Sequence, residues 1–197
     1  MAATLSYFLS TQRDAVGLAT FAAEIEDYIP PRYRTGHLRR LMVSLERDAR
    51  GQDTHLAKPL LQIAERLNKR GMLVLISDLL APLETLEESL GSLTVRGQDV
   101  IVFHILDPEE LRFQYEVPEL FVDLETDQRI YVDPTVIRRE YLKRFGEHLA
   151  SIEGICSRLG LLYQRISTDT PLETALPEVI RIRMQARGNS RTRIARR

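Results

Sequence analysis

The sequence has little cysteine, no tryptophan and no long apolar run, and these absences exclude several classes of protein. Its single cysteine, Cys156, cannot supply an internal disulfide framework or a cysteine-rich zinc site, and it fits a reducing compartment. No apolar run approaches the ~20 residues that a membrane-spanning helix needs. The first residues carry neither the positive charges nor the apolar stretch of a secretion signal. We therefore expect a soluble, cytoplasmic chain.

The chain also lacks an excess of charge of either sign. It has 27 Lys and Arg residues and 28 Asp and Glu residues, so the formal net charge is −1. This balance argues against a protein that binds nucleic acid over its whole surface. The charge is uneven, however: residues 181–197 hold seven arginines and no acidic residue, so the first 180 residues carry −8. The length of 197 residues and the 44% hydrophobic content predict one globular domain at 1–188, followed by a basic tail at 189–197.

Apolar spacing predicts strands that alternate with helices along most of the chain. Helical spacing of apolar residues predicts helices at 3–12, 37–48, 55–70, 83–96, 135–159 and 171–188. Continuous or nearly continuous apolar runs predict buried strands at 15–21, 72–80, 99–106 and 161–168. Strands separated by helices of ten or more residues are typical of an α/β fold with a mainly parallel sheet.

Two segments depart from this alternation. Residues 24–31 alternate in polarity and end in two prolines, which suits an antiparallel edge strand at about 24–29 because proline cannot donate to a sheet ladder. Residues 119–126 and 128–134 flank Asp127 and predict a hairpin insertion at about 119–133.

Candidate ligand-binding residues lie where strands end, because ligands of open α/β sheets bind beyond the carboxyl ends of the strands. Asp78 follows the most apolar strand, and Asp53 and Thr54 lie in a polar loop. Their carboxylate and hydroxyl oxygens are suitable ligands for Mg²⁺, Mn²⁺ or Ca²⁺. The local alternative is that Asp78 caps the next turn and Thr54 caps the helix that starts at His55. The residues alone leave both interpretations open.

No other motif carries chemistry. The chain has no GxGxxG, no Walker-type loop and no HExxH, so nucleotide or zinc-protease chemistry has no support. The four histidines lie on different elements without ligand spacing, and His104 is expected to be a buried, hydrogen-bonded core residue. Cys156 lies on the apolar side of a long helix and is expected to be a core residue rather than a nucleophile.

A series of motifs in fixed order carries a resemblance to a known family. The motifs are DAVGLATF, IPPRYRTGHLRRL, GQDTHLAKPL, MLVLISDLL, GQDVIVFHILDPEE and LFVDLETDQRIYVDP. Together they resemble the bacterial von Willebrand factor A-like proteins of unknown function that are usually encoded beside MoxR-type AAA+ ATPases. The resemblance extends from about residue 3 to about residue 180. It implies a three-layer α/β sandwich that interacts with a MoxR-type ATPase.

The same resemblance implies a partial metal site. A von Willebrand A domain holds a divalent metal through an Asp-x-Ser-x-Ser motif, a loop threonine and an aspartate that ends its fourth strand. Thr54 matches the threonine and Asp78 matches the aspartate, but the Asp-x-Ser-x-Ser motif is absent. We therefore expect a vestigial site that binds no cofactor, or Mg²⁺ only weakly.

The chain opens in what resembles the first helix of such a domain, so we expect it to be N-terminally incomplete. The absent first strand would lie between 15–21 and 72–80. The two unpaired strand edges would then favour self-association.

The function that these patterns favour is a non-enzymatic protein-interaction module that works with a MoxR-type ATPase. Two other classes remain as alternatives. One is a metal-dependent hydrolase that uses Asp78 and Asp53. The other is an RNA-associated adaptor that acts through the arginine-rich tail, although no aromatic residues alternate with the arginines to stack on bases.

Overall fold

The computed structural model describes residues 1–47, 56–67, 69–94, 97–122, 129–171 and 174. They form, in chain order, α1 (Ala2–Thr11), β1 (Val16–Phe21), β2 (Ile25–Arg32), α2 (His37–Leu45), α3 (Ala57–Arg66), β3 (Met72–Ser77), α4 (Leu83–Thr94), β4 (Asp99–Leu106), α5 (Pro108–Arg112), β5 (Glu119–Val122), β6 (Arg129–Val132), α6 (Pro134–Arg158) and β7 (Leu162–Ser167). Each helix and strand predicted between residues 3 and 168 is present. Apart from residues 171 and 174, the helix predicted at 171–188 lies outside the described residues, as do the basic tail, Asp53 and Thr54.

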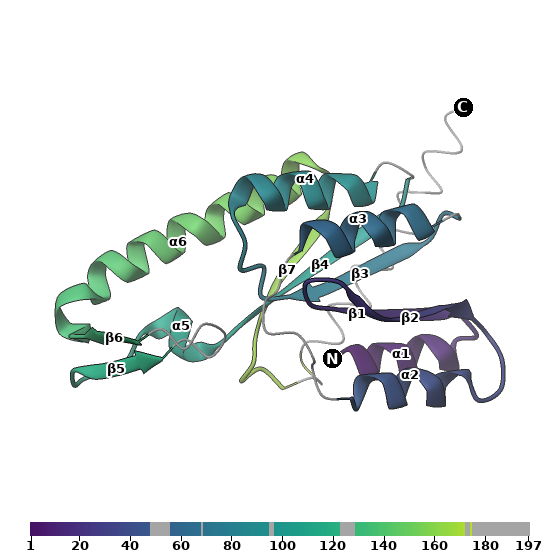
Figure 1. Ribbon diagram of the computed structural model, residues 1–197, viewed down its shortest axis with the longest axis horizontal. Helices are drawn as coiled ribbons and strands as arrows, with labels where there is room; N and C mark the ends of the chain where they lie inside the picture. Colours follow the sequence, from purple (N-terminus) through teal and green to yellow (C-terminus); the bar gives the residue numbers. More distant parts are fainter. Residues whose placement is uncertain (48–55, 68, 95–96, 123–128, 172–173, 175–197) are drawn as a thin grey trace.

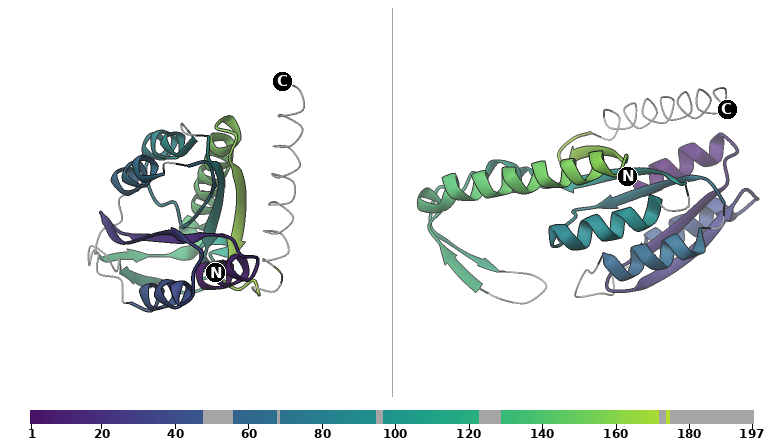
Figure 2. Two further views of the ribbon diagram at one scale, coloured as in Figure 1. Left: turned by 90° about the vertical axis from the view of Figure 1, so that its right-hand side faces the viewer. Right: turned by 90° about the horizontal axis from the view of Figure 1, so that it is seen from above.

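A parallel sheet of three strands in the order β3-β4-β7 forms the centre of the molecule (Figure 1). The middle strand, β4, is hydrogen-bonded on both sides, and Phe103 is in register with Ile76 of β3 and with Gln164 of β7. Val100 and Val102 of β4 face one core cluster, which contains buried residues of α3, α4 and α6. Ile101 and Phe103 face a second cluster, which contains Leu5 of α1. Helices therefore cover both faces of the sheet, as expected for a three-layer α/β sandwich (Figure 2).

Strands β1 and β2 pair antiparallel, as expected for the segment that ends in two prolines, with Leu18 in register with Ile29. Gly17 permits a close approach of the two backbones, because a Cβ there would lie 2.8 Å from the carbonyl oxygen of Ile29. The pair differs from the expected edge of one continuous sheet: among the described residues, neither β1 nor β2 pairs with any other strand. The side chain of His37 in α2 donates from Nε2 to the carbonyl oxygen of Val16, 2.7 Å away, and so joins α2 to β1.

The predicted hairpin is confirmed as the antiparallel pair β5 and β6, in which Leu120 is opposite Tyr131. We call α5, β5, β6 and the first half of α6 the arm, comprising residues 108–122 and 129–148. Figure 1 shows the arm projecting from one end of the parallel sheet. It begins directly after β4 and returns to the body of the protein through α6, whose 25 residues span roughly 37 Å at 1.5 Å per residue.

The long helix α6 is not buried along its whole predicted apolar side. Leu149, Ile152 and Ile155 in its second half are buried, whereas Val136 near its start is 74% exposed. The second half packs against the core cluster beneath α4, and the first half extends past the sheet as part of the arm (Figure 1). The apolar periodicity was correct, but only its second half packs into the core beneath α4.

Two boundaries fall earlier than the sequence predicts. The strand predicted at 72–80 ends at Ser77, because Leu79 adopts a positive φ of 54° that a strand cannot continue through. The helix predicted to end at Gly71 ends at Arg66, because Leu67 has an extended conformation with ψ 90°. None of the helices within the described ranges combines the length and the apolar character of a membrane span.

The helix α3 offers a direct test of the packing. Leu60 is 1% exposed and its neighbour Leu61 is 52% exposed. We expect Leu60→Ala to lower the free energy of unfolding by about 2–5 kcal/mol, because it leaves a cavity in the core. The matched variant Leu61→Ala should change it by no more than about 0.5 kcal/mol. Denaturant titration of both variants measures the difference, and equal losses would contradict the helix register.

Candidate functional site

The carboxyl ends of the three parallel strands bring several polar residues to one edge of the sheet. Ser77 ends β3 and Asp78 follows it, Asp107 follows β4, and Ser167 ends β7 and is followed by residues 168–169. We call this edge the crest. It is where ligands bind in open α/β sheets, so it is the first place to look for a site.

Asp78 is exposed at the crest, on a turn with a strained backbone. The next residue, Leu79, combines a positive φ of 54° with a fully buried side chain. Such a conformation costs about 1–3 kcal/mol for a residue other than glycine, and the buried Leu79 side chain helps to hold it. The carboxylate Oδ1 of Asp78 accepts from the backbone N–H of Leu80 at 3.3 Å. The local role considered for Asp78, capping the following turn, is therefore observed.

Asp107 caps the short helix α5. Its carboxylate accepts from the backbone N–H of Glu109 at 2.8 Å, while Glu110 accepts from the backbone N–H of Asp107 at 3.2 Å. This reciprocal capping box fixes the direction in which the chain leaves β4 and enters the arm.

Asp169 is also engaged locally. It accepts from the Ser167 hydroxyl at 2.5 Å and from the guanidinium of Arg112 at 3.2 Å. The contact with Arg112 ties the end of β7 to α5. The crest carboxylates Asp107 and Asp169 thus stabilise the base of the arm.

The described residues of the crest do not fit a divalent metal ion. Within the described ranges, no group of three or more His, Cys, Asp or Glu residues could hold a metal ion. Mg²⁺ requires several fixed oxygen ligands because it gives up its water reluctantly. Thr54 and Asp53, the other two residues predicted to act here, lie outside the described residues, so their convergence with Asp78 stays a prediction.

His104 lies in the core beneath the crest, with 1% of its surface exposed. Its Nδ1 is 2.7 Å from the hydroxyl of Tyr163, and the backbone of Asp78 also hydrogen-bonds to the ring. Burial lowers the pKa of His104, because the charged form loses more hydration than the neutral form, and the contact with Asp78 opposes this effect. The predicted role of His104 as a hydrogen-bonded core residue is confirmed.

Cys156 is fully buried within the core cluster of α4 and α6. Burial raises its pKa to about 11, so the thiol is protonated at neutral pH and is a poor nucleophile. The prediction that Cys156 is a core residue is confirmed.

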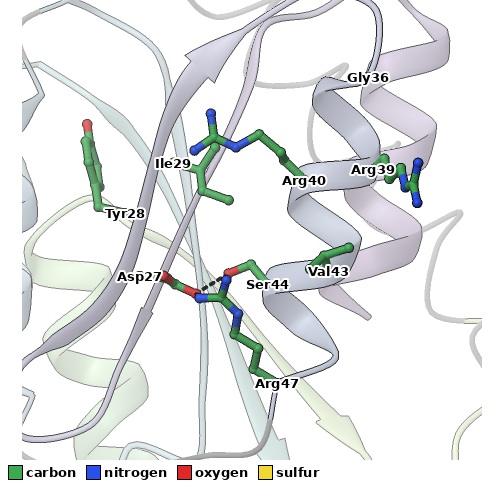
Figure 3. A pocket seen from close by; sticks show the side chains of 9 residues that line it. All are labelled: Asp27, Tyr28, Ile29, Gly36, Arg39, Arg40, Val43, Ser44 and Arg47. Atoms are coloured by element: carbon green, nitrogen blue, oxygen red, sulfur yellow. Dashed lines mark hydrogen bonds and ion pairs between the residues drawn. The ribbon is translucent and has the colours of Figure 1, made fainter.

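A shallow hollow of about 270 Å³ lies between β2 and α2 and is lined by three arginines (Figure 3). Arg47 pairs with Asp27 at 2.7 Å, and Ser44 donates to the same carboxylate oxygen at 2.8 Å. In Figure 3, Arg40 extends from α2 towards Ile29, whereas Arg39 points away from β2. The only carboxylate of the lining is thus occupied, and the hollow is basic and open to solvent.

The arm has an aromatic core of its own, centred on Phe113. The ring of Phe113 stacks on Tyr141 of α6 at 4.4 Å between centroids, meets Tyr115 edge-on at 5.2 Å, and lies 6.2 Å from Phe121 of β5. Tyr115 in turn meets Phe121 edge-on at 5.1 Å. Such pairs each add about 0.5–1.5 kcal/mol beyond their buried area, so the arm has defined packing.

Outside this aromatic core, the arm exposes much apolar surface. Of the thirteen large hydrophobic residues that are exposed among the described residues, eight lie between 111 and 137. These eight are Leu111, Val117, Leu120, Val122, Ile130, Tyr131, Val136 and Ile137. Exposed apolar patches of this kind mark interaction sites.

The sequence predicted the hairpin but not its apolar surface. A signal was present, because β5 is apolar at three successive positions, Leu120, Phe121 and Val122, which places apolar side chains on both faces of the hairpin. One face packs through Phe121 onto the aromatic core. Leu120 and its partner Tyr131 lie on the other face, and they are 53% and 72% exposed.

We expect this chain to lack a tight divalent-metal site, because the described crest residues do not assemble enough ligands. Calorimetric titration with Mg²⁺ and with Mn²⁺ should show no binding in the micromolar range. Micromolar binding that is lost in Asp78→Ala would contradict this expectation and would show that residues outside the described ranges complete a site.

We expect the free energy of unfolding to fall as the pH drops below about 6.5, the pKa of an unfolded histidine. The lowered pKa of His104 in the fold means that the unfolded chain binds an extra proton in this range, so acid favours unfolding. His104→Gln should reduce this pH dependence. Tyr163→Phe should retain it, because burial, the largest cause of the shift, persists. Unfolding curves from about pH 7 to pH 5 measure both, and an unchanged slope in His104→Gln would refute the assignment.

Comparison with known proteins places the chain in a family. The model of the family described as "Protein of unknown function DUF58" matches residues 1–151, which include every element from α1 to β6 and most of α6. No curated protein and no solved structure matches the chain. The family match spans well over half of the 197 residues, the parallel sheet's β3 and β4 and the arm among them, and the chain therefore belongs to the DUF58 family.

Proposed function

We propose that this chain is a non-enzymatic protein-interaction module and that the apolar face of its arm contacts the partner. The partner, by the resemblance of the sequence motifs to von Willebrand factor A-like proteins, is a MoxR-type AAA+ ATPase. The observation that carries the proposal is the concentration of exposed apolar side chains on the arm.

The composition of this face supports a protein partner. It combines an aromatic residue, Tyr131, with the aliphatic residues Leu120 and Val122 on the same face of the hairpin. Aromatic residues are enriched at protein–protein interfaces, because they bury a large area with few rotatable bonds. Arg129, exposed on the same hairpin, adds a polar margin of the kind that surrounds an interface core.

The packing of the arm also supports the proposal. A surface that already has its bound conformation loses less conformational entropy on association. Phe113 fixes the hairpin against α6 by stacking on Tyr141. Arg138 of α6 donates to the carbonyl oxygen of Arg112 at 3.2 Å and fixes α6 against α5.

The arm and the crest share one end of the molecule, because the arm begins at the residue that follows Asp107 (Figure 1). A partner seated on the arm can therefore reach the exposed Asp78 carboxylate as well. In the metal-binding relatives that the sequence resembles, this edge holds the cation that a partner carboxylate completes. For this chain we propose a contact that needs no metal, or binds Mg²⁺ only weakly.

The absence of enzymatic activity is part of the proposal. The titratable side chains whose pKa values shift most, Cys156 and Tyr163, lie in the core with raised pKa values. Asp107 and Asp169 at the crest hold caps and ion pairs of the fold. These roles leave no described pair of acid and base poised in a cleft, as hydrolysis would require.

The test is retention of a cognate MoxR-type ATPase on immobilised protein. Leu120→Ser and Tyr131→Ser should each weaken retention at least about tenfold, because hot-spot residues contribute on the order of 2 kcal/mol. The matched control is Leu61→Ser on α3, since Leu61 is 52% exposed and Leu120 is 53% exposed. All three variants should melt within a few degrees of the native protein.

The variant Asp78→Ala distinguishes a contact made by the arm from a contact made by the crest. A loss of retention in Asp78→Ala with native retention in both hairpin variants would move the contact to the crest and overturn the role of the arm. Equal losses in Leu61→Ser and Leu120→Ser would show that retention reflects general stickiness rather than a defined surface.

A further inference from the structure

Residues 28–45, which include most of β2, the loop after it and α2, contain four arginines and no acidic residue. The four are Arg32, Arg34, Arg39 and Arg40, and all of them are exposed. We call these arginines, together with Tyr33, the basic face. This concentration of positive charge contrasts with the net charge of −8 over the first 180 residues.

The arginines of the basic face have no carboxylate partners in the part of the chain that the structure describes. Arginines elsewhere in the body are neutralised, as Arg158 is by Glu87. Asp27, the carboxylate that lines the adjacent hollow, is already engaged by Arg47 and Ser44. The charge of the basic face is therefore available to an anion from outside these residues.

The backbone that carries the basic face is held in place from both sides. His37 joins the start of α2 to β1 through the carbonyl oxygen of Val16, and Ser44 joins its end to β2 through Asp27. The loop is held against the first turn of α2, because the carbonyl oxygen of Arg34 accepts from the backbone N–H of His37 at 3.1 Å. A ligand thus meets arginines whose backbone positions are already set, which lowers the entropic cost of binding.

The charges of the basic face are spread along an open surface (Figure 3). Arg40 extends from α2 towards Ile29, and Arg39 points away from β2. The hollow beside them, of about 270 Å³, is shallow and open to solvent. Small molecules are bound in enclosed and mostly apolar pockets, so this surface suits an extended polyanion better.

Tyr33 gives the basic face a second chemical feature. Its side chain is 58% exposed and lies in the sequence between Arg32 and Arg34. Within the described ranges, Tyr33 takes part in none of the ring stacks or cation–ring contacts, whereas the ring of Tyr28 is contacted by Arg66. Arginines that contact phosphates, combined with an exposed ring that stacks on a base, are typical of proteins that bind single-stranded nucleic acid.

From these observations we infer that the basic face binds single-stranded nucleic acid without sequence preference. Arg34, Arg39 and Arg40 contact phosphates, to which a guanidinium can donate two parallel hydrogen bonds. One base stacks on Tyr33, and because every base has a flat face, the stacking is sequence-tolerant. A duplex keeps its base faces within its own stack, and an acidic polypeptide has no bases, so neither would use the exposed ring in this way.

The test measures binding of the whole chain to a fluorescent oligothymidylate of about twelve nucleotides, a length within the usual range of single-strand sites. Anisotropy titrations at several salt concentrations give the slope of log K against log salt. Three phosphate contacts on the basic face should contribute a slope of about −2. The arginines of residues 181–197 are common to all variants, so the comparison between variants isolates the basic face.

Arg34→Gln and Arg40→Gln should each weaken binding and reduce the magnitude of this slope by about 0.7, because each removes one phosphate contact. The matched control is Arg139→Gln on α6. Arg139 is also exposed and belongs to no ion pair among the described residues, so its replacement should change neither quantity.

Tyr33→Leu should weaken binding at least about fivefold, because it removes the ring on which a base stacks. Tyr33→Phe should bind as the native protein does, since the ring is retained. The matched control is Tyr131→Leu, which removes an exposed ring from the arm and should leave the affinity for the oligonucleotide unchanged. All these side chains are exposed, so each variant should melt within a few degrees of the native protein.

Three results would overturn the inference. In the first, the chain binds no oligonucleotide even at low salt. In the second, the arginine variants bind with native affinity and slope, which would assign the binding to residues outside the basic face. In the third, Tyr33→Leu keeps native affinity and polyglutamate displaces the oligonucleotide as well as unlabelled oligothymidylate does, which would make an acidic polypeptide the ligand. The basic face lies apart from the arm, so none of these results bears on the partner proposed for the arm (Figure 1).

Discussion

The burial of β4 on both faces is the constraint on which the rest of the structure depends. Val102 faces the core beneath α3, α4 and α6, and Phe103 faces the core beneath α1, so one strand fixes both helical layers. Burying each such side chain contributes about 1.5–3 kcal/mol. Because hydrogen bonds to β3 and β7 fix its position, β4 also determines where its carboxyl end lies. The chain therefore enters the arm at Pro108 in one direction, which the Asp107 cap then secures.

The order and type of the elements could be predicted from apolar periodicity, because each helix and strand outside the arm buries at least part of the pattern that identified it. The extent of burial could not. An apolar pattern reports that a segment can be buried, and whether a partner meets it depends on tertiary packing. Val136 and Ile152 share the predicted apolar side of α6, yet one is 74% exposed and the other is fully buried. Strand β3 shows the same limit. Its apolar sequence predicted a fully buried strand, but Leu75 is the only one of its six residues that is buried.

For the candidate site, too, the position of a residue could be predicted and its contacts could not. The rule that ligands bind beyond strand ends located Asp78 correctly at the crest, because parallel strands end at a common edge. What the sequence could not supply was the set of contacts that each carboxylate makes. Asp169 accepts from Arg112, which is 57 residues away, and no local pattern predicts such a pair. The apolar surface of the arm escaped prediction for a related reason: it depends on Phe113 stacking on Tyr141 of a distant helix, which leaves the opposite face of the hairpin without cover.

The end of β3 shows how the core of the protein determines the geometry of the crest. Ser77 ends β3, and its hydroxyl accepts from the backbone N–H of Leu79 at 3.1 Å. Leu79 holds a positive φ with its side chain buried in the cluster that contains Leu75. Strained conformations persist only where their surroundings over-determine them. The buried Leu79 side chain thus holds the turn that carries the exposed Asp78 carboxylate. The core of the body therefore sets the geometry of the crest at the end of β3, through the side chain that anchors this turn.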